Sequence, residues 1–185
     1  MHRAPQPQLA PGGLDAAALA LAPDLDPILA QWLTSDGLLT ERLRALPHMR
    51  LRTLAETDVT LSDRDRALTR TEDRSGRLRE ISMQSGDTRY VYGSSVIPAS
   101  LLAAYPWLSQ LGDEPLGATL TTRLVVARSA FTFYRLAVAE PLAQRAAGRV
   151  LQEPLWSRCS TFQLPLGFIL VTEVFLPPLA QWPIS

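Results

Sequence analysis

Length, composition and charge indicate one globular domain without a large nucleic-acid interface. The chain has 185 residues, of which 46% are hydrophobic and 19% charged, enough to bury one substantial core. Its 18 basic residues balance 18 acidic residues, so the net charge of zero offers no excess of positive charge to a phosphate backbone.

Few residues are available for a metal site or a catalytic triad. Cys159 is the single cysteine, which excludes an intramolecular disulfide and a multi-cysteine metal site. We expect a buried, inert thiol there; the alternative, a catalytic thiol, needs a base beside it. The histidines are His2 and His48, too few for a His-rich metal site, and a Ser-His-Asp triad has only His48 to use. The Gly-x-Ser-x-Gly elbow of many hydrolases is absent.

The start of the chain differs in composition from the rest. Pro, Gln, Gly and Ala dominate residues 1–24, for which we predict a flexible tail, and residues 25–185 are expected to form the domain. No segment reaches the roughly 18 uninterrupted apolar residues of a membrane-spanning helix. The proline-rich start is also unlike a signal peptide. We therefore expect no membrane span and a cytoplasmic location.

Two short helices are predicted at the start of the domain. Asp26 is suited to an N-cap and Pro27 to a first turn, so a helix begins here and ends at Ser35-Asp36-Gly37. A second, leucine-rich helix follows and stops before Pro47. The two are expected to form a helical hairpin.

Period-two alternation then predicts several strands. A first strand covers residues 49–55, and the charged stretch 62–76 is expected to be a solvated turn or an edge strand. Residues 77–84 and 89–98 form a hairpin around Gly86-Asp87. The second half is expected to contain, in order, a helix or two turns at 100–110, a helix from Pro115 through Leu120 and a β-prone run at 123–136. A helix from about 140 to 151 and a final hairpin of 156–164 with 167–176 follow. This order predicts an α+β fold with a single antiparallel sheet of about six strands.

Glu173 stands out in the most hydrophobic run of the chain, residues 167–177. Alternate residues of a strand share a face, so Glu173 points the same way as Ile169, Val171 and Phe175. A carboxylate on an apolar face is costly unless it is paired, hydrogen-bonded or neutral. Either this face is partly wet or Glu173 is held by a core arginine, or Glu173 lines a pocket that needs a carboxylate.

Arg79 is the corresponding cationic exception. It shares a strand face with Ile81 and Met83, which fits a snorkelling arginine at a sheet edge or a fork that takes a carboxylate bidentately. If Arg79 and Glu173 face one cavity, a small ligand with a carboxylate at one end and a hydroxyl or ether at the other fits between them. Leu116 at a helix start offers a free N–H group to an anion, although an ordinary helix start explains it equally well.

Several segments between residues 25 and 178 together carry a resemblance to a known family. They are Trp32-Leu33 with Asp36–Thr40, Arg77–Ile81, Gly93–Pro98, Leu111–Gly117, Leu155–Arg158, Ser160 and Leu170–Pro177. In this order they resemble chorismate pyruvate-lyases, which convert chorismate to 4-hydroxybenzoate and pyruvate at the entry to ubiquinone biosynthesis.

The resemblance implies a fold, a site and a set of partners. The fold is an antiparallel sheet whose internal cavity is closed by helical flaps, without a metal or organic cofactor. The binding arginine falls on Arg79, the functional glutamate on Glu173, and the backbone N–H groups that meet the product carboxylate on Leu39 and Leu116. The implied partners are chorismate, 4-hydroxybenzoate and pyruvate, with no nucleic acid, and the small single domain fits a monomer.

Two departures from the family pattern bear on the site. Residues 136–153 are longer than expected for this loop, so the cavity mouth is expected to differ. Cys159 and Thr161 occupy positions at which the family usually has basic residues, although Arg158 is present as in the family. We therefore expect the second carboxylate of chorismate to be bound in a different way here.

Two other functions remain open from the sequence. Effector domains of some transcription regulators have a similar fold and sense small molecules, but they normally follow a winged helix, for which the stretch before Leu25 is too short. The other possibility is a lyase-like protein that yields a different hydroxybenzoate or only binds one.

Overall fold

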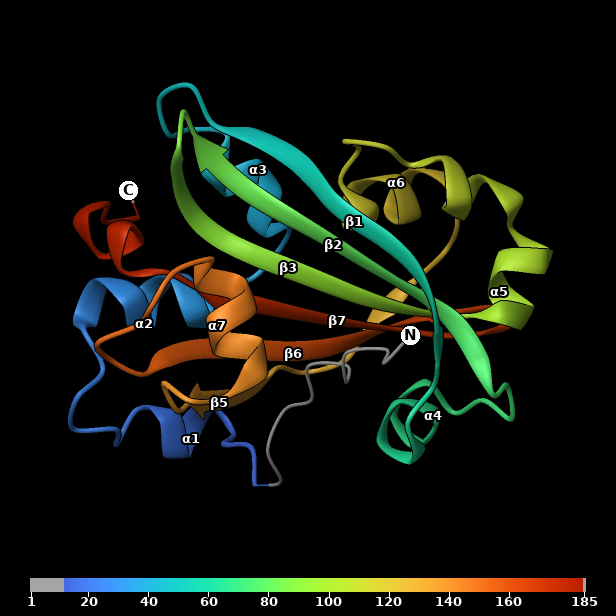
Figure 1. Ribbon diagram of the computed structural model, residues 1–185, viewed down its shortest axis with the longest axis horizontal. Coiled ribbons are helices and arrows are strands. Elements are labelled where there is room, and N and C mark those ends of the chain that lie inside the picture. The colour runs from blue at the N-terminus through green and yellow to red at the C-terminus, as the bar shows by residue number, and fades with distance from the viewer. Residues whose placement is uncertain (1–11, 185) are drawn as a thin grey trace.

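The computed structural model describes residues 12–184 and has the predicted α+β class (Figure 1). Its core is a seven-stranded sheet in the order β1-β2-β3-β7-β6-β4, with β5 also paired to β6, and the pairings are antiparallel. The strands are β1 (Arg50–Thr60), β2 (Ser75–Ser85), β3 (Thr88–Pro98), β4 (Ala127–Arg128), β5 (Thr132–Leu136), β6 (Leu155–Leu164) and β7 (Gly167–Phe175).

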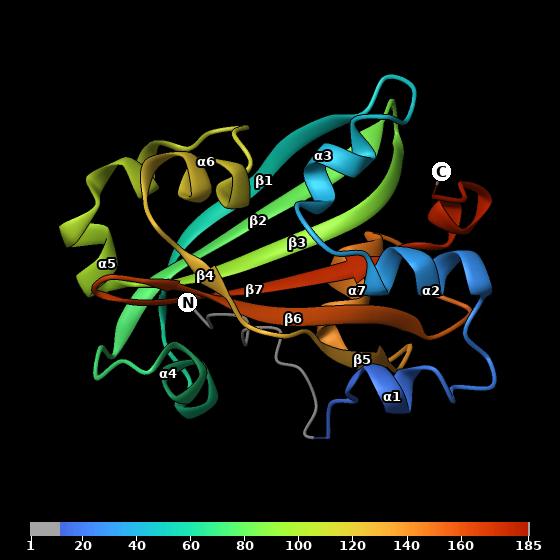
Figure 2. The same cartoon turned by 180° about the vertical axis from the view of Figure 1, so that it is seen from behind.

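Short helices cover both faces of this sheet. They are α1 (Ala16–Leu19), α2 (Pro27–Thr34), α3 (Leu39–Leu43), α4 (Asp63–Thr69), α5 (Ala99–Ala104), α6 (Leu116–Arg123) and α7 (Pro141–Ala147), with 3-10 turns η1 (Pro106–Gln110) and η2 (Pro177–Gln181). Figures 1 and 2, taken from opposite sides, show α7 on one face and α3 and α6 on the other. We call residues 35–43 the first flap and residues 111–123 the second flap.

Two hairpins form the centre of the sheet, as their alternation and turn residues predict. In the first, β2 pairs with β3 through a turn in which Gly86 has a φ of +56°, a left-handed value that favours glycine. In the second, β6 pairs with β7. The contact between β3 and β7 then joins the hairpins and places Gly93 opposite Glu173.

The core divides into layers on the two sides of the sheet. Leu142 and Ala146 of α7 pack with Tyr92 and Val174 on one side. On the other side, the first flap packs over β2 and β7 through one apolar cluster, and the second flap packs over β6 through another. Burying these apolar side chains contributes about 25 cal/mol per Å² of area removed from water, which holds the flaps against the sheet.

Two local predictions were wrong. Residues 62–76 were expected to be a turn or edge strand, but Asp63–Thr69 form helix α4. A capping box starts it, because the side chains of Ser62 and Asp65 each accept a hydrogen bond from the other's backbone N–H. The β-prone run 123–136 contains only the short strands β4 and β5, since Arg123 still belongs to α6 and residues 124–126 and 129–131 form no strand.

The long segment 136–153 lies away from the predicted cavity mouth. Its helix α7 packs on the face of the sheet opposite the flaps, and Gly148 ends it with a φ of +64°. The segment was expected to alter the cavity mouth, and its position on the other face of the sheet shows that this expectation is wrong.

Part of the predicted tail contacts the domain. Residues 1–11 of that prediction lie outside the described residues. Leu14 exchanges backbone hydrogen bonds of 2.7 and 2.8 Å with Phe133, and Leu19 of α1 is buried. A domain boundary at residue 25 remains a prediction. Within residues 12–184, no helix has both the length and the apolarity to cross a bilayer.

Candidate active site

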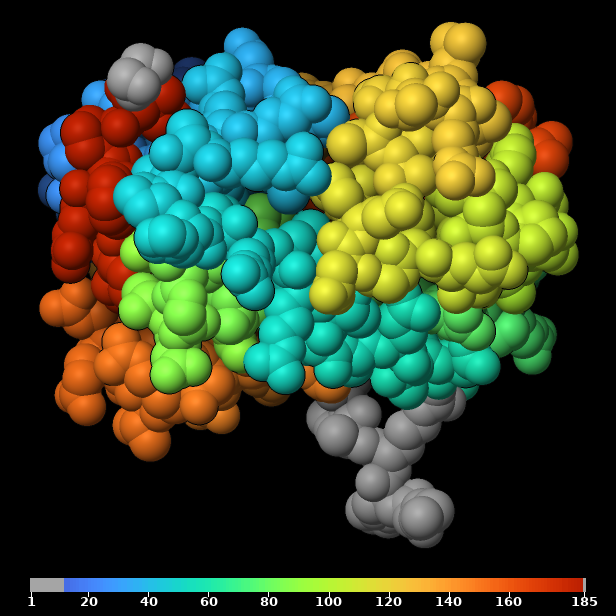
Figure 3. All heavy atoms as spheres, turned by 90° about the horizontal axis from the view of Figure 1, so that it is seen from above, coloured from blue at the N-terminus to red at the C-terminus, as the bar shows by residue number. Residues whose placement is uncertain are grey.

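A cavity lies between the sheet and the two flaps. The empty space between its walls is about 490 Å³ when the open solvent at its mouth is counted. The first flap contributes Leu38, Leu39 and Thr40, and the second contributes Pro115, Leu116 and Gly117. Figure 3 shows the two flaps, light blue and yellow, facing each other across a hollow in which green strand atoms are visible.

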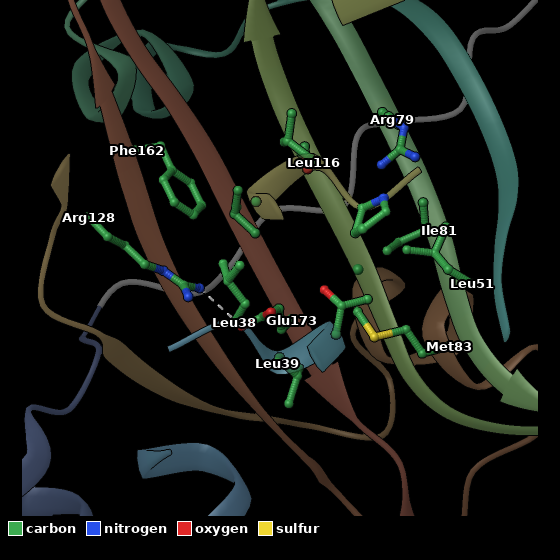
Figure 4. Close-up of a pocket in the computed structure, with 16 residues that line it drawn as sticks. Leu38, Leu39, Leu51, Arg79, Ile81, Met83, Leu116, Arg128, Phe162 and Glu173 are labelled. Carbon is green, nitrogen blue, oxygen red and sulfur yellow. Dashed lines mark hydrogen bonds and ion pairs between the residues drawn. The ribbon is translucent and has the colours of Figure 1, made fainter. Parts of the chain in front are cut away.

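The structure brings the four predicted site residues together in this cavity. Arg79, Glu173, Leu39 and Leu116 all line it. Figure 4 shows Arg79 on one side of the cavity and Glu173 on another, with Leu116 near Arg79 and Leu39 near Glu173. The predicted cationic and anionic ends therefore exist in one pocket, while the roles of these residues remain predictions.

Glycines at two positions shape the cavity. Gly93 lies between Ile81 of β2 and Glu173 of β7, and a Cβ atom there would come within 2.9 Å of Ile81 Cγ1. The missing side chain leaves the cavity floor open next to Glu173. A Cβ atom at Gly117 would come within 2.9 Å of Leu38 Cδ2, so this glycine allows the two flaps to approach closely.

Arg79 holds the second flap. Its Nη2 donates to the carbonyl oxygens of Gly112 at 2.7 Å and Glu114 at 2.9 Å, and its side chain is only 1% exposed. Nε lies 3.3 Å from Glu56 Oε1, an ion pair without hydrogen-bond geometry. Burial lowers the pKa of the guanidinium, and the charge of Glu56 opposes that shift. The snorkelling alternative is therefore wrong for Arg79.

Glu173 both lines the cavity and is held by a core arginine. Its Oε2 accepts a hydrogen bond from Arg158 Nε at 2.6 Å and one from Arg128 Nη2 at 3.3 Å. The core-arginine alternative is therefore confirmed, and Glu173 also lines the cavity, while the need for a carboxylate there remains a prediction. Both contacts end on the same carboxylate oxygen.

Arg158 connects Glu173 to the first flap. The residue is completely buried, and its Nη1 donates to the carbonyl oxygens of Trp32, Leu33 and Ser35 at the end of α2. These carbonyls lack partners within the helix, so the guanidinium satisfies them. The segment that leads into the first flap is therefore held by the same side chain that orients Glu173.

Arg128 is a cavity residue that sequence reasoning missed. It lies on the two-residue strand β4, and its guanidinium is stacked near the rings of Phe131 and Phe162, 4.4 and 5.1 Å from their centroids. Burial is the main cause of its lowered pKa, and Glu173 opposes that shift. Its one signal in the sequence is a charged residue within the apolar, β-prone run 123–136, without the alternation that assigned a face to Glu173.

Cys159 lies outside the cavity lining and is buried. Burial raises its pKa to about 11. The thiol is therefore protonated at neutral pH. Within residues 12–184, no group of three His, Cys, Asp or Glu side chains is arranged to hold a metal ion.

We expect Cys159 to stay unmodified by a disulfide reagent such as DTNB at pH 8 in the native protein. A thiol with a pKa near 11 has about 0.1% thiolate at that pH, and burial also blocks access. One equivalent should react after denaturation in guanidinium chloride. Rapid labelling of the native protein would contradict the inert-thiol prediction.

Comparisons with known proteins place this chain in a family. The chorismate lyase family model matches residues 16–182. A protein of Halorhodospira halophila is 34% identical, with 95% of each chain covered, and one of Nitrosospira multiformis is 32% identical, with 85% of this chain and 91% of the relative covered. Both carry the name "Probable chorismate pyruvate-lyase".

Among solved structures, the effector domain of PhnF from Mycobacterium smegmatis has a TM-score of 0.57 at 14% identity, covering 77% of this chain and 90% of that domain. A GntR-family transcriptional regulator from Bacillus cereus also has a TM-score of 0.57, at 11% identity, covering 71% of this chain and 93% of the regulator. At these identities the likeness shows the fold alone. The sequence matches carry the assignment, and the chain belongs to the chorismate lyase family.

Proposed function

We propose that this protein is a chorismate pyruvate-lyase that converts chorismate to 4-hydroxybenzoate and pyruvate. The observation that carries the proposal is one flap-covered cavity with Arg79 and Glu173 on its wall, in a chain of the chorismate lyase family. The cavity offers a cation for a ring carboxylate and a carboxylate for the opposite end of the ring.

The reaction needs little acid–base chemistry from the protein. The bond between the ring and the ether oxygen breaks, the adjacent ring carbon that bears the hydroxyl loses its proton as the ring becomes aromatic, and the enolpyruvyl methylene gains a proton as pyruvate forms. We propose that most of the rate comes from holding these atoms close together and from fixed charges around them.

Arg79 and the flap N–H groups are proposed to anchor the ring carboxylate. Leu39 and Leu116 are the first residues of α3 and α6, and neither helix has a side-chain hydrogen bond at its N-cap. First-turn N–H groups have no acceptor within a helix, so a carboxylate in the cavity is a suitable partner. A guanidinium also has five donors, of which the flap carbonyls use Nη2 only.

Glu173 is proposed to act at the ring oxygen and the departing proton. Arg158 and Arg128 fix the carboxylate through Oε2, so its direction is set before the ligand binds. From that position it can orient the reacting group or remove the proton. The glutamine variant discussed below separates these roles.

Release of pyruvate from chorismate, coupled to lactate dehydrogenase and NADH oxidation, tests the proposed function. The proposal predicts steady turnover. The second candidate is a non-catalytic domain that binds a small aromatic acid, which is favoured by the fold likeness to effector domains. That candidate predicts saturable binding of 4-hydroxybenzoate without pyruvate release.

The finer parts of the function are also proposals. The product is proposed to enter ubiquinone synthesis, and the protein to act as a cytoplasmic monomer. Light scattering coupled to size-exclusion chromatography tests the monomer, for which the expected mass is 20.4 kDa. A mass of twice that value would contradict it.

The second flap is also held closed from outside the cavity, by Thr53 of β1. Its Oγ1 donates to the Gly112 carbonyl at 2.5 Å, and its N–H donates to Asp113 Oδ1 at 2.7 Å. The hydrogen bonds from Thr53 lower the pKa of the Asp113 carboxyl. If the product leaves only when the flap opens, these contacts slow its release.

Thr53→Val is expected to raise the dissociation rate of 4-hydroxybenzoate about fivefold. One neutral hydrogen bond contributes about 1 kcal/mol, and the loss falls on the closed state only. Stopped-flow displacement measures the rate. Thr57→Val, an exposed threonine on the same strand, is the control and should leave it unchanged. Equal dissociation rates of 4-hydroxybenzoate in Thr53→Val and the wild type would exclude a role for the Thr53 hydrogen bonds in holding the second flap closed.

A further inference from the structure

The cavity wall carries a second cation, Arg128, to which the proposed function gives no contact with the ligand. Of the described residues that line the cavity, the charged ones are Arg79, Arg128 and Glu173. Figure 4 shows Arg128 on the side of the cavity away from Arg79, with Glu173 near it. The side chain of Arg128 is 18% exposed, whereas that of Arg158 behind Glu173 is fully buried. A ligand in the cavity can therefore reach Arg128 but not Arg158.

The hydrogen bonds of Arg128 leave part of its guanidinium available. Nε donates to Ser160 Oγ at 2.8 Å, Nη1 to the Gly37 carbonyl at 3.2 Å, and Nη2 to Glu173 Oε2 at 3.3 Å. These contacts use three of the five N–H donors of a guanidinium. One donor remains on each terminal nitrogen, and both can serve a ligand oxygen.

The charges around Glu173 also leave a positive excess. Arg128 and Arg158 both contact the single carboxylate of Glu173, so the three groups together carry one net positive charge. Such an excess in a partly desolvated wall is stabilised by an anion. The rings of Phe131 and Phe162 hold the guanidinium in place, so little of its freedom is lost when an anion binds.

We infer that Arg128 binds the enolpyruvyl carboxylate of chorismate, and thereby distinguishes substrate from product. This inference rests on the proposed function. Chorismate has two carboxylates, one on the ring and one on the enolpyruvyl group. With the ring carboxylate at Arg79, the second carboxylate lies toward Glu173 and Arg128. The product 4-hydroxybenzoate has only the ring carboxylate and makes no such contact.

The inference predicts a split between substrate and product affinity. In Arg128→Met, which removes the charge and keeps an unbranched chain, kcat/KM for chorismate is expected to fall about tenfold to hundredfold, mostly through KM. The inhibition constant of 4-hydroxybenzoate should stay within about twofold of the wild-type value. Arg128→Lys, which keeps the charge without the planar fork, should recover part of the loss.

Arg79→Met is the matched comparison, because it should weaken chorismate and 4-hydroxybenzoate together. A merely structural role for Arg128 predicts the same joint loss, since a distorted cavity binds both ligands poorly. An unchanged KM in Arg128→Met, or equal changes for substrate and product, would overturn the inference. If the methionine variant does not fold, Arg128→Lys decides. In that variant the ratio of the KM for chorismate to the inhibition constant of 4-hydroxybenzoate should rise above the wild-type ratio.

The experiment also separates this inference from the proposed function. If the wild type releases no pyruvate from chorismate, the proposed function fails. The equilibrium affinities of the wild type and Arg128→Met for chorismate and for 4-hydroxybenzoate, measured by calorimetry, then test Arg128 without turnover. A selective loss of chorismate affinity in Arg128→Met supports the assignment. Equal changes in the affinities for chorismate and 4-hydroxybenzoate contradict it.

Discussion

Replacement of Arg79 by alanine is expected to lower kcat/KM for chorismate by about 100-fold to 1000-fold. The variant removes the charge-assisted contact proposed for the ring carboxylate, and it removes the guanidinium that holds the second flap through the carbonyls of Gly112 and Glu114. Each loss acts on the bound complex, so together they amount to several kcal/mol of transition-state binding. Steady-state kinetics with the coupled pyruvate assay measures the effect.

Arg77 offers a matched control for this variant. It lies on the same strand, forms an ion pair with Asp58 and does not line the cavity. A partly exposed pair of this kind contributes about 0–1 kcal/mol, so Arg77→Ala should keep kcat/KM within about threefold of wild type. An unaltered kcat/KM in Arg79→Ala would contradict the proposed role of Arg79 in binding the substrate.

Glu173→Gln is expected to lower kcat by about 100-fold or more while 4-hydroxybenzoate still binds. The amide keeps an oxygen that can accept from Arg158, but it carries no charge and cannot take the proton from the ring. The variant also leaves Arg128 and Arg158 without their shared counterion, which destabilises the fold by up to about 3–5 kcal/mol. Kinetics and denaturant unfolding should therefore both change.

A variant of Glu80 is the control that separates the loss of turnover expected in Glu173→Gln from the loss of stability. It is as buried as Glu173, but it packs against α7, where it binds Arg145 Nε at 2.6 Å and the hydroxyl of Tyr92. Glu80→Gln should lower stability and keep kcat within about threefold of wild type. Near-normal turnover in Glu173→Gln would exclude the general base and leave the orienting role.

The sequence singled out two charged residues that the structure places in one cavity, but it did not give the boundaries of several elements. Arg79 and Glu173 were found because a charge on an alternating apolar strand is costly, so its presence indicates a paired or functional group. Their common cavity depends on β3 pairing with β7, a contact between distant hairpins that no local pattern specifies. The structure shows that contact, with Gly93 of β3 opposite Glu173 of β7.

The features that the sequence did not predict, namely helix α4, Arg128 and the contacts of Arg158, were missed for physical reasons. Helix α4 is stabilised by the Ser62–Asp65 capping box rather than by apolar periodicity, so a search for periodicity does not detect it. Arg128 escaped because its strand is only two residues long, too short for alternation to assign a face. Arg158 was seen as a retained basic residue, but its three flap carbonyls become partners only after folding.

The products formed from chorismate test the central claim most directly. Purified protein is incubated with chorismate, and the mixture is separated by liquid chromatography with mass detection. We predict equimolar 4-hydroxybenzoate and pyruvate, with both products lost in Arg79→Ala and retained in Arg77→Ala. Formation of a different hydroxybenzoate, or recovery of chorismate unchanged, would contradict the claim.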